Sequence, residues 1–295
     1  MERVREWLVH KNIVCRMGVP GSLLTTFGSG GRAALAAYPA SAGELAELLS
    51  FLEEEDVPHR VLGAGSNVLF PDEGVRGVIL RLDAINDFSV RGTTVTVGAG
   101  MSMPVFSRKC SEASLSGAEY AEGIPGKVGG AVYMNASAFG MGVSDTLRSV
   151  DVILRGERMT LPASELAMRY HRGGLPVGAV ITSATFDLIK GERTSIADKM
   201  RENAEKRART QPVGRSAGSV FRPAGEMPAA LYIEETGLKG TCIGGAELSE
   251  KHCNFIVNRG GASTKDFFSL GERIRCAVRE KTGVTLEYEV ERIEC

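Results

Sequence analysis

The segment Arg60-Val-Leu-Gly-Ala-Gly-Ser-Asn67 is the most informative part of the chain, because an apolar run ends there in a glycine-rich turn. A second apolar run, Gly77-Val-Ile-Leu-Arg-Leu82, follows it, which predicts a strand, a turn and another strand. Ahead of these strands, Ser41-Ala-Gly-Glu44 is a capping box, and leucines at helical spacing follow from Leu45 to Leu52. The sequence therefore predicts a helix over residues 42–55 and a small α/β lobe at the start of the chain.

Further elements are expected along the rest of the chain. The patterns predict a strand over 93–97, a helix over 104–115, a charged helix over 196–209, a helix over 264–282 capped by Gly283, and a strand over 284–290. In the last strand Glu289 would point away from the apolar side chains, toward solvent. We expect a domain boundary at the charged helix, and a separate α+β unit in the last third.

Length and composition exclude several classes of protein. The chain has 295 residues, 43% of them hydrophobic, which is enough for two or three domains or lobes. A formal charge of −1 offers no basic excess for a general nucleic-acid binder. No signal-peptide core or membrane-spanning apolar stretch occurs, so a soluble, cytoplasmic protein without a membrane partner is predicted. The six cysteines contain no C-x-x-C pair, so no zinc or other metal site is predicted.

The loop Gly63-Ala-Gly-Ser-Asn67 is a candidate anion site. A row of backbone N–H groups without bulky side chains can bind a pyrophosphate. The loop is not the Rossmann fingerprint, because Val68 stands where the third glycine would be needed. By itself it is equally typical of a plain hairpin turn.

The stretch Gly123-Ile-Pro-Gly-Lys-Val-Gly-Gly130 is a second glycine-rich loop. It is not a Walker loop, because Ala121 and Val128 replace the glycine and the hydroxyl residue that such a loop requires. Two such loops suit one long ligand with a central diphosphate, such as a dinucleotide, lying between two lobes. The alternative is two unrelated surface loops.

The stretch Ser216-Ala-Gly-Ser-Val-Phe221 places two hydroxyls beside Gly218. The nucleophile pattern G-x-S-x-G is absent, which argues against an esterase. An aliphatic hydroxyl is a very weak acid and protonates only a strongly basic, carbanion-like centre. A serine in a turn is structural more often than catalytic, and Glu289 would be a solvent-facing residue in most proteins.

Nine short motifs occur in order along nearly the whole chain. They are Thr25–Ala33, Val61–Leu69, Gly117–Gly126, Arg209–Pro212, Ser216–Phe221, Gly237–Gly240, Ile243–Ala246, Ser249–Asn258 and Leu286–Val290. Together they resemble the UDP-N-acetylenolpyruvoylglucosamine reductase family, flavoenzymes that complete UDP-N-acetylmuramate in bacterial peptidoglycan synthesis. The stretch 186–212 is too short for the long tyrosine-bearing loop of the family's first type, so the chain resembles the shorter, second type.

This resemblance implies an α+β architecture with a vanillyl-alcohol-oxidase-like FAD-binding fold. Two α/β lobes, residues 1–85 and 86–195, would bind FAD, and a C-terminal α+β domain, residues 196–295, would bind the UDP-sugar. FAD would be non-covalent and NADPH would be the co-substrate. The residues expected to contact FAD are Gly63, Ala64, Gly65, Ser66, Asn67, Gly123, Ile124, Gly126, Gly129, Gly130 and Asn135.

The family's mechanism implies roles for Ser219 and Glu289. In that mechanism NADPH reduces FAD, NADP⁺ leaves, and hydride then passes to the terminal vinyl carbon of the enolpyruvyl ether. By motif match Ser219 would protonate the resulting carbanion, a centre basic enough for a serine acid. Glu289 would help to polarise the enolpyruvyl group. The predicted reaction is the reduction of UDP-N-acetylglucosamine enolpyruvate to UDP-N-acetylmuramate.

Two positions depart from the family pattern. Where the family has an arginine facing the substrate carboxylate, this chain has His171, and Arg172 comes one residue later. Either a protonated His171 or a shifted Arg172 would have to supply the positive charge. The family's Phe-(Lys/Arg)-Asn-Pro is replaced here by Phe221-Arg-Pro-Ala224, so Pro223 stands at an expected asparagine.

Two rival functions share the expected fold. One is a module that binds FAD or a nucleotide sugar and has lost turnover through these departures. The other is a sugar-type flavin oxidase, which the sequence favours less because nothing in it resembles that substrate domain.

Overall fold

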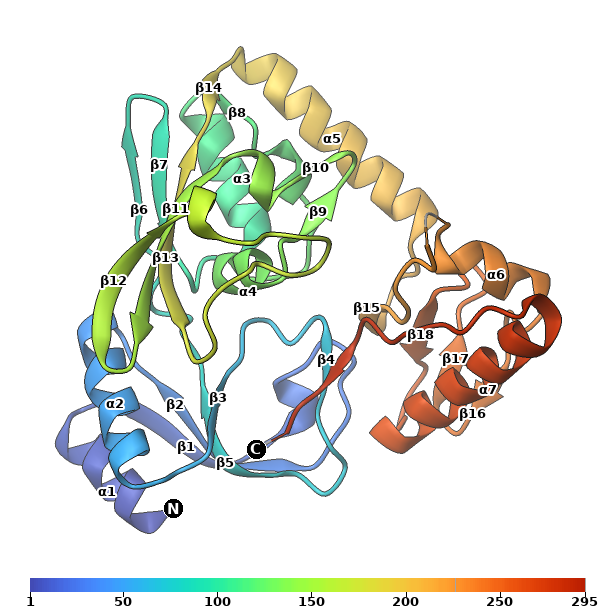
Figure 1. Cartoon of the computed structure of the whole chain (residues 1–295), viewed down its shortest axis with the longest axis horizontal. Coiled ribbons are helices and arrows are strands. Elements are labelled where there is room, and N and C mark those ends of the chain that lie inside the picture. The colour runs from blue at the N-terminus through green and yellow to red at the C-terminus, as the bar shows by residue number, and fades with distance from the viewer. Residues whose placement is uncertain (226, 295) are drawn as a thin grey trace. The chain divides into compact units, whose positions relative to one another are not determined.

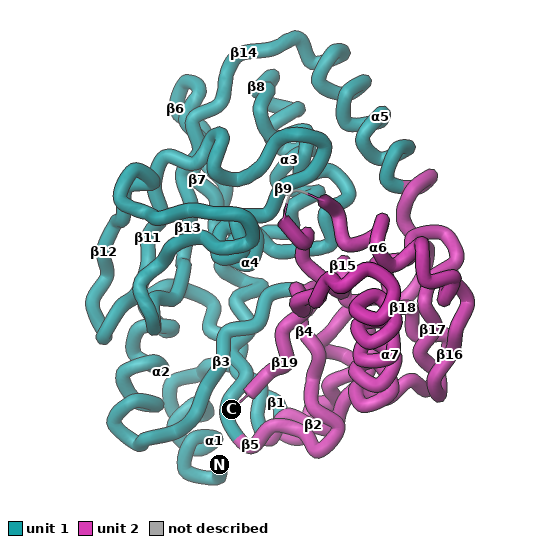
Figure 2. The backbone as a smooth tube through the Cα atoms, turned by 45° about the vertical axis from the view of Figure 1, so that its right-hand side comes forward, with its two compact units in different colours: residues 1–16, 35–64, 77–207 teal, residues 17–34, 65–76, 208–295 magenta. Residues whose placement is uncertain are grey.

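The computed structural model describes residues 1–225 and 227–294 (Figure 1). They form two compact units: unit 1 comprises residues 1–16, 35–64 and 77–207, and unit 2 comprises residues 17–34, 65–76 and the chain from 208 onward (Figure 2). Cys295, one of the six cysteines, lies outside the described residues. None of the described helices is long and apolar enough to cross a membrane.

The first sheet of the chain has the strand order β1-β2-β5-β3. Its strands are β1 (Val14–Pro20), β2 (Arg32–Tyr38), β3 (His59–Val61) and β5 (Val75–Leu80). The chain passes from one unit to the other within β1, β2 and β5. β3 and β5 pair in parallel, which requires a crossover between them instead of a tight turn.

The helix predicted at the Ser41 capping box is α2 (Ala42–Glu54) of unit 1. The Ser41 hydroxyl accepts from the Glu44 N–H, and the Glu44 carboxylate accepts from the Ala40 N–H. Its four predicted leucines, Leu45, Leu48, Leu49 and Leu52, are all buried. They join one core of unit 1 that also takes in α1 (Glu2–His10) and α3 (Met103–Glu112). α3 ends before the predicted Leu115 because Ser114 adopts a φ of +56°.

The second sheet lies wholly in unit 1 and has the antiparallel order β12-β11-β13-β7-β6. In the predicted strand β7, Val95 and Val97 are buried and Thr94 and Thr96 are partly exposed, as the alternation predicts. The sheet strands are β6 (Phe88–Arg91), β7 (Thr94–Gly98), β11 (Leu147–Leu154), β12 (Glu157–Pro162) and β13 (Val180–Asp187). The remaining elements are β8 (Leu115–Ser116), α4 (Val128–Tyr133), β9 (Ser137–Ala138), β10 (Met141–Gly142), β14 (Ile189–Lys190), α5 (Arg193–Thr210) and short 3₁₀ turns.

Unit 2 contains a third sheet, with the antiparallel order β15-β18-β17-β16. The predicted helix over 264–282 is α7, with a capping box at Ser263 and Asp266 and a left-handed Gly283 at its end. Phe267, Leu270, Ile274 and Val278 on one face of α7 are buried in the core of this unit. The other elements are β4 (Val68–Leu69), β15 (Arg215–Ser219), α6 (Ala229–Glu235), β16 (Cys242–Ile243), β17 (Ala246–Leu248), β18 (Phe255–Asn258) and β19 (Glu291–Arg292).

The prediction of a strand over 284–290 is wrong. This segment contains one isolated bridge, between Tyr288 and Phe221, and the strand that follows, β19, begins at Glu291. The alternation also breaks, because Glu289 and Val290 are both buried, at 4% exposure each. A segment that pairs with different partners along its length has no single solvent face, so the solvent-facing reading of Glu289 is wrong too.

Candidate active site

The loop of residues 63–67 is not a hairpin turn. It leads from β3 to β4, but β3 pairs in parallel with β5, and β4 pairs in parallel with β19. The two strands that flank the loop therefore do not pair with each other. The hairpin alternative for this loop is wrong.

The backbone N–H groups of residues 63–67 find no hydrogen-bond acceptor in the part of the chain that the structure describes. Backbone donors are normally satisfied by protein, water or a ligand. Successive unpaired N–H groups in a turn form a concavity that binds anions. The loop therefore fits a phosphate or diphosphate group.

Gly65 is required by the packing of unit 2 itself. Its φ is +66°, and a Cβ on it would lie 2.2 Å from the Leu24 carbonyl oxygen. The Gly65 carbonyl accepts from the Thr26 N–H at 3.0 Å, so the loop is fixed against residues 24–26. No side chain fits at this position, whether or not a ligand is bound.

The second glycine-rich loop, residues 123–130, leads into α4 in unit 1. The Gly129 N–H donates to the Ala99 carbonyl at 2.9 Å, and a Cβ on Gly129 would lie 2.9 Å from Ala99 Cβ. The Gly126 carbonyl accepts from the Met103 N–H at 3.0 Å, and Ile124 packs against the core. By contrast, a Cβ on Gly130 would have nothing within 4 Å. The loop is thus anchored on residues 99–103 and leaves Gly130 open.

Within unit 1, Lys127 of the second glycine-rich loop lies beside Gly63, the first residue of the other loop. A Cβ on Gly63 would lie 3.5 Å from Lys127 Cβ, and Lys127 Nζ lies 2.9 Å from Asp83 Oδ1. Burial raises the pKa of Asp83, but hydrogen bonds from Lys127 and Arg81 outweigh it and lower that pKa overall. Lys127 is therefore paired with a carboxylate that it shares with Arg81, unlike the phosphate-binding lysine of a Walker loop.

Ser219 stands at the end of β15 in unit 2, directly after an irregularity in the ladder. β15 pairs with β18, and the register shifts between Ser216 and Ser219 because Gly218 has a φ of +78°. A bulge of this kind redirects the side chains that follow it. The Ser219 hydroxyl makes no hydrogen bond to any described residue, and the residue is partly exposed. The Ser219 hydroxyl is therefore available to a ligand.

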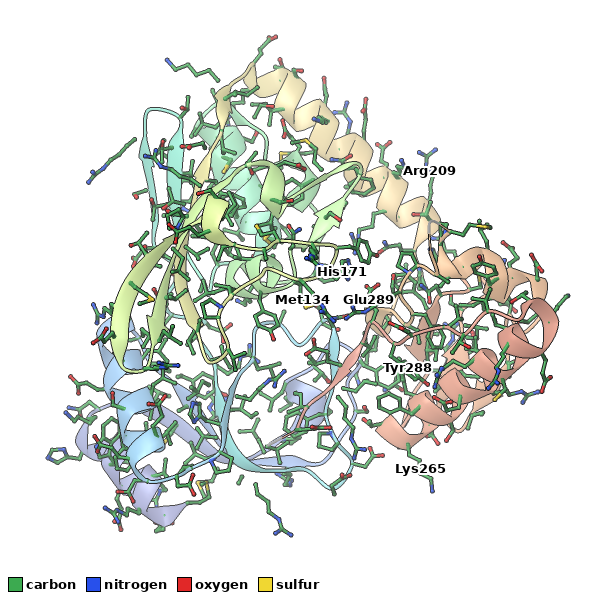
Figure 3. The ribbon with its side chains drawn as sticks, in the orientation of Figure 1. Met134, His171, Arg209, Lys265, Tyr288 and Glu289 are labelled. Carbon is green, nitrogen blue, oxygen red and sulfur yellow. The ribbon has the colours of Figure 1, made fainter. Side chains whose placement is uncertain are left out.

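The backbone of Glu289 is hydrogen-bonded to Val220, the residue that follows Ser219. The Glu289 N–H donates to the carbonyl of Val220 at 2.9 Å, and the next pair along is the bridge between Phe221 and Tyr288. The Glu289 carbonyl accepts from the Asn67 side-chain amide at 3.1 Å. Figure 3 labels Tyr288 and Glu289 on the segment between α7 and β19. Three predicted site residues, Asn67, Ser219 and Glu289, are therefore brought together in unit 2.

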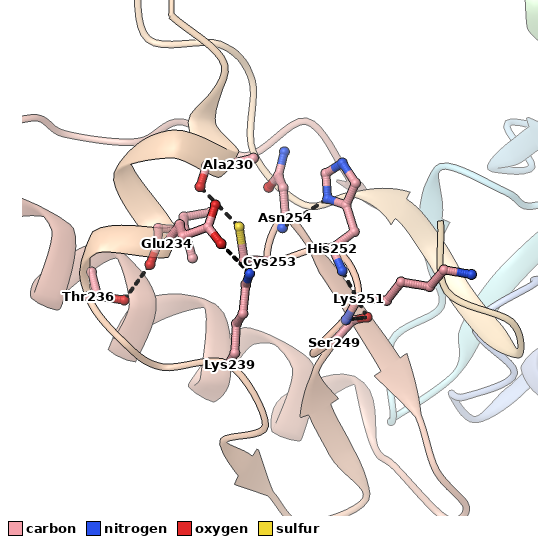
Figure 4. A network of polar contacts seen from close by, with 10 residues as sticks. Ala230, Glu234, Thr236, Lys239, Ser249, Lys251, His252, Cys253 and Asn254 are labelled. Atoms are coloured by element: carbon pink, nitrogen blue, oxygen red, sulfur yellow. Dashed lines mark hydrogen bonds and ion pairs between the residues drawn. The ribbon is translucent and has the colours of Figure 1, made fainter. Parts of the chain in front are cut away.

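Asn254 fixes the chain that follows Ser219. Its side chain accepts from the Phe221 N–H at 3.0 Å and donates to the Phe221 carbonyl at 2.9 Å. Its carbonyl accepts from the Val220 N–H at 2.9 Å. The Asn254 N–H in turn donates to His252 Nδ1, within the polar network of residues 249–254 drawn in Figure 4. These bonds hold both residues after Ser219 in place.

Both candidates for the missing arginine lie on one tight turn of unit 1, residues 169–172. The N–H groups of Arg169 and Arg172 each donate to the other's carbonyl, at 2.9 and 3.0 Å. His171 has a φ of +50°, and its ring stacks on Tyr170 with centroids 4.2 Å apart. His171 is partly buried and Arg172 is exposed.

Comparison with known proteins places this site in a family. A model of the C-terminal domain of UDP-N-acetylenolpyruvoylglucosamine reductase matches residues 210–293, and a model of an FAD-binding domain matches residues 33–160. The UDP-N-acetylenolpyruvoylglucosamine reductase of Ruegeria pomeroyi is 39% identical over 287 residues, covering 92% of each chain. The Bacillus subtilis reductase is 38% identical and covers 90% of each chain.

The chain belongs to the UDP-N-acetylenolpyruvoylglucosamine reductase family. Within it, a crystal structure from Thermus caldophilus matches with a TM-score of 0.83 and 34% identity, over 96% of this chain and 99% of that one. A glucooligosaccharide oxidase from Acremonium strictum matches with a TM-score of 0.52 at 13% identity, over 97% of this chain and 60% of that one, which shows a shared fold alone. The vanillyl-alcohol-oxidase-like fold is confirmed, and the chain is an FAD-dependent oxidoreductase.

Sequence analysis did not predict two residues of this reductase-family site. Asn254 is one, and Thr26, whose hydroxyl donates to the Ser216 carbonyl at 2.6 Å, is the other. Both residues lie inside family motifs, and those motifs could have pointed to them. Their hydrogen-bond partners, however, are distant in sequence, so no local pattern reveals their roles. Pro223, which replaces the family's asparagine, is exposed.

The histidine of the Asn254 network makes unit 2 sensitive to acid. Burial lowers the pKa of His252 from its ordinary value of 6.5, so the unfolded chain takes up a proton there before the folded protein does. The stability from neutral His252 is present above pH 6.5 and is lost as pH falls toward the lowered pKa. Thermal melting on both sides of pH 6.5 should show this loss in the wild type and a smaller one in His252→Gln. Equal losses in the two proteins would contradict it.

Proposed function

We propose that the chain catalyses the NADPH-dependent reduction of UDP-N-acetylglucosamine enolpyruvate to UDP-N-acetylmuramate in peptidoglycan synthesis, and that it does so in the cytoplasm. The observation that carries the proposal is the arrangement in unit 2. There Ser219 carries a partly exposed hydroxyl, and the carbonyl of the next residue, Val220, accepts a hydrogen bond from the N–H of a buried glutamate, Glu289.

The two glycine-rich loops support the binding of FAD. The unpaired N–H groups of residues 63–67 and the open space at Gly130 suit a diphosphate, whose oxygens act as hydrogen-bond acceptors. The residues proposed to hold it are Gly63, Ala64, Gly65, Ser66, Asn67, Gly123, Gly126, Gly129 and Gly130. Bound FAD, once reduced by NADPH, supplies a hydride donor.

Ser219 is proposed as the general acid. Its Oγ–H would donate a proton to the substrate carbon next to the carboxylate after hydride has been added at the neighbouring carbon. Glu289, at 4% exposure, would act on the substrate from a medium of low dielectric constant, where electrostatic interactions are strong. Fixing both groups through adjacent backbone bonds sets the distance between them before substrate binds.

The 169–172 turn is proposed to supply the positive charge for the substrate carboxylate, through His171 or Arg172. For the domains, we propose that residues 1–85 and 86–195 serve FAD and that residues 196–295 serve the UDP-sugar. The matches of family models to residues 33–160 and 210–293 support this division.

One assay separates this function from its rivals. NADPH consumption should be slow alone and rise when the enolpyruvyl UDP-sugar is added, with UDP-N-acetylmuramate formed in equal amount. A binding module that has lost turnover would bind FAD and the UDP-sugar without this rise. A sugar oxidase would instead oxidise a free sugar with oxygen and leave NADPH untouched. Either result would contradict the proposal.

A further inference from the structure

Asn135 lies at the end of α4 in the left-handed conformation, with a φ of +44°. The hydrogen bonds around it form the usual helix-ending pattern: Met134 N–H to Gly130, Asn135 N–H to Val132 and Ala136 N–H to Ala131. Glycine is the commonest residue at this position because it has no Cβ, and asparagine is merely tolerated. The backbone therefore accepts asparagine at this position but does not require it.

The side-chain amide of Asn135 makes two hydrogen bonds to distant backbone. Its Nδ2 donates to the Arg169 carbonyl at 3.1 Å, and its Oδ1 accepts from the Ser144 N–H at 3.1 Å. The Arg169 carbonyl is the one that closes the 169–172 turn, since it also accepts from the Arg172 N–H. The amide thus acts directly on the turn that carries His171 and Arg172.

The far end of the same turn is also seated on the end of α4. The Gly173 N–H donates to the Tyr133 carbonyl at 2.7 Å, and a Cβ on Gly173 would lie 2.3 Å from the Val132 carbonyl oxygen. Asn135 and Gly173 therefore hold the turn at its two ends.

We propose that Asn135 is a positioning residue, whose amide fixes the 169–172 turn and so places the cation that receives the substrate carboxylate. The inference rests on the proposed function, because it needs that turn to supply the cation. It is independent of whether His171 or Arg172 carries the charge. It also differs from the cofactor contact that the sequence predicts for Asn135.

The chain provides a closely matched control at the end of α1. Asn12 has a φ of +56° and the same pattern of hydrogen bonds, with Lys11 N–H to Trp7, Asn12 N–H to Val9 and Ile13 N–H to Leu8. Its side chain is exposed and bonds to none of the described residues. Asn12→Gly and Asn135→Gly therefore make the same backbone change, but only the second removes hydrogen bonds of the side chain.

The experiment uses the FAD-loaded full chain and follows each half-reaction by stopped flow. Asn135→Gly should leave FAD content and reduction by NADPH unchanged and should weaken apparent binding of the enolpyruvyl substrate about tenfold. Asn135→Asp keeps the acceptor for Ser144 but loses the donor to Arg169, so it should be as damaging as Asn135→Gly. Asn12→Gly should match the wild type.

A double-mutant cycle then tests whether Asn135 acts through the turn. His171→Gln and Arg172→Gln are made singly, and Asn135→Gly is added to whichever of them weakens substrate binding. Little further loss in the double variant would support the inference, because the two residues would share one effect. Fully additive losses, a lowered FAD content, or an unaffected Asn135→Asp would overturn it while leaving the proposed function standing. If neither His171→Gln nor Arg172→Gln has an effect, the proposed source of the cation fails, and this inference fails with it.

Discussion

Ser219→Ala is expected to leave reduction of bound FAD by NADPH close to the wild-type rate. Reoxidation by the enolpyruvyl substrate should slow by about 10²-fold or more, which is the usual contribution of a positioned general acid. The reason is that a proton is needed on the substrate only after hydride has been transferred. Stopped-flow traces at the flavin absorbance would measure both steps.

Ser216→Ala is the control for this prediction, since Ser216 lies in the same strand on the other side of the bulge. The contact that Ser216 makes with Thr26 uses its backbone carbonyl, which the substitution keeps. It should therefore have much less effect than Ser219→Ala. Equal slowing of both half-reactions in Ser219→Ala would mean that the hydroxyl is structural.

Gly65→Ala is expected to destabilise the protein and to yield it without FAD. The left-handed backbone costs a non-glycine residue about 1–2 kcal/mol. Overpacking adds a further cost of about 1–3 kcal/mol, because the new Cβ would lie 2.2 Å from the Leu24 carbonyl oxygen. Relieving that contact must move the 63–67 loop. Thermal melting and the flavin absorbance of the purified protein would measure the two effects.

Substitutions at two other glycines distinguish the backbone cost from the steric cost of Gly65→Ala and from its effect on FAD binding. Gly92 has a φ of +65°, but a Cβ on it would have nothing within 4 Å, so Gly92→Ala should show the backbone cost alone and keep FAD. Gly130 also has open space around it and no positive φ, so Gly130→Ala should fold normally and weaken FAD binding if the diphosphate approaches there. A stable, fully yellow Gly65→Ala protein would contradict the assignment of this loop.

The sequence by itself determined the local elements whose signals lie within a few residues. The capping box at Ser41 and the leucines that follow predict α2, and the apolar face over 264–282 together with Gly283 predicts α7 from its first residue to its last. Such signals suffice because caps and amphipathic faces act over one or two helical turns. The family motifs added the fold and the cofactor, which the comparisons confirm.

Only the tertiary structure decided which way the loops and the last segment pair. The 63–67 loop has the composition of a hairpin, yet it joins strands that pair elsewhere, because parallel partners come from β5 and β19. Glu289 has the spacing of a solvent-facing strand residue, yet its N–H bonds to the distant Val220 and its side chain is buried. Pairing over such separations depends on how distant segments share a core and backbone hydrogen bonds, and no local pattern of side chains contains that information.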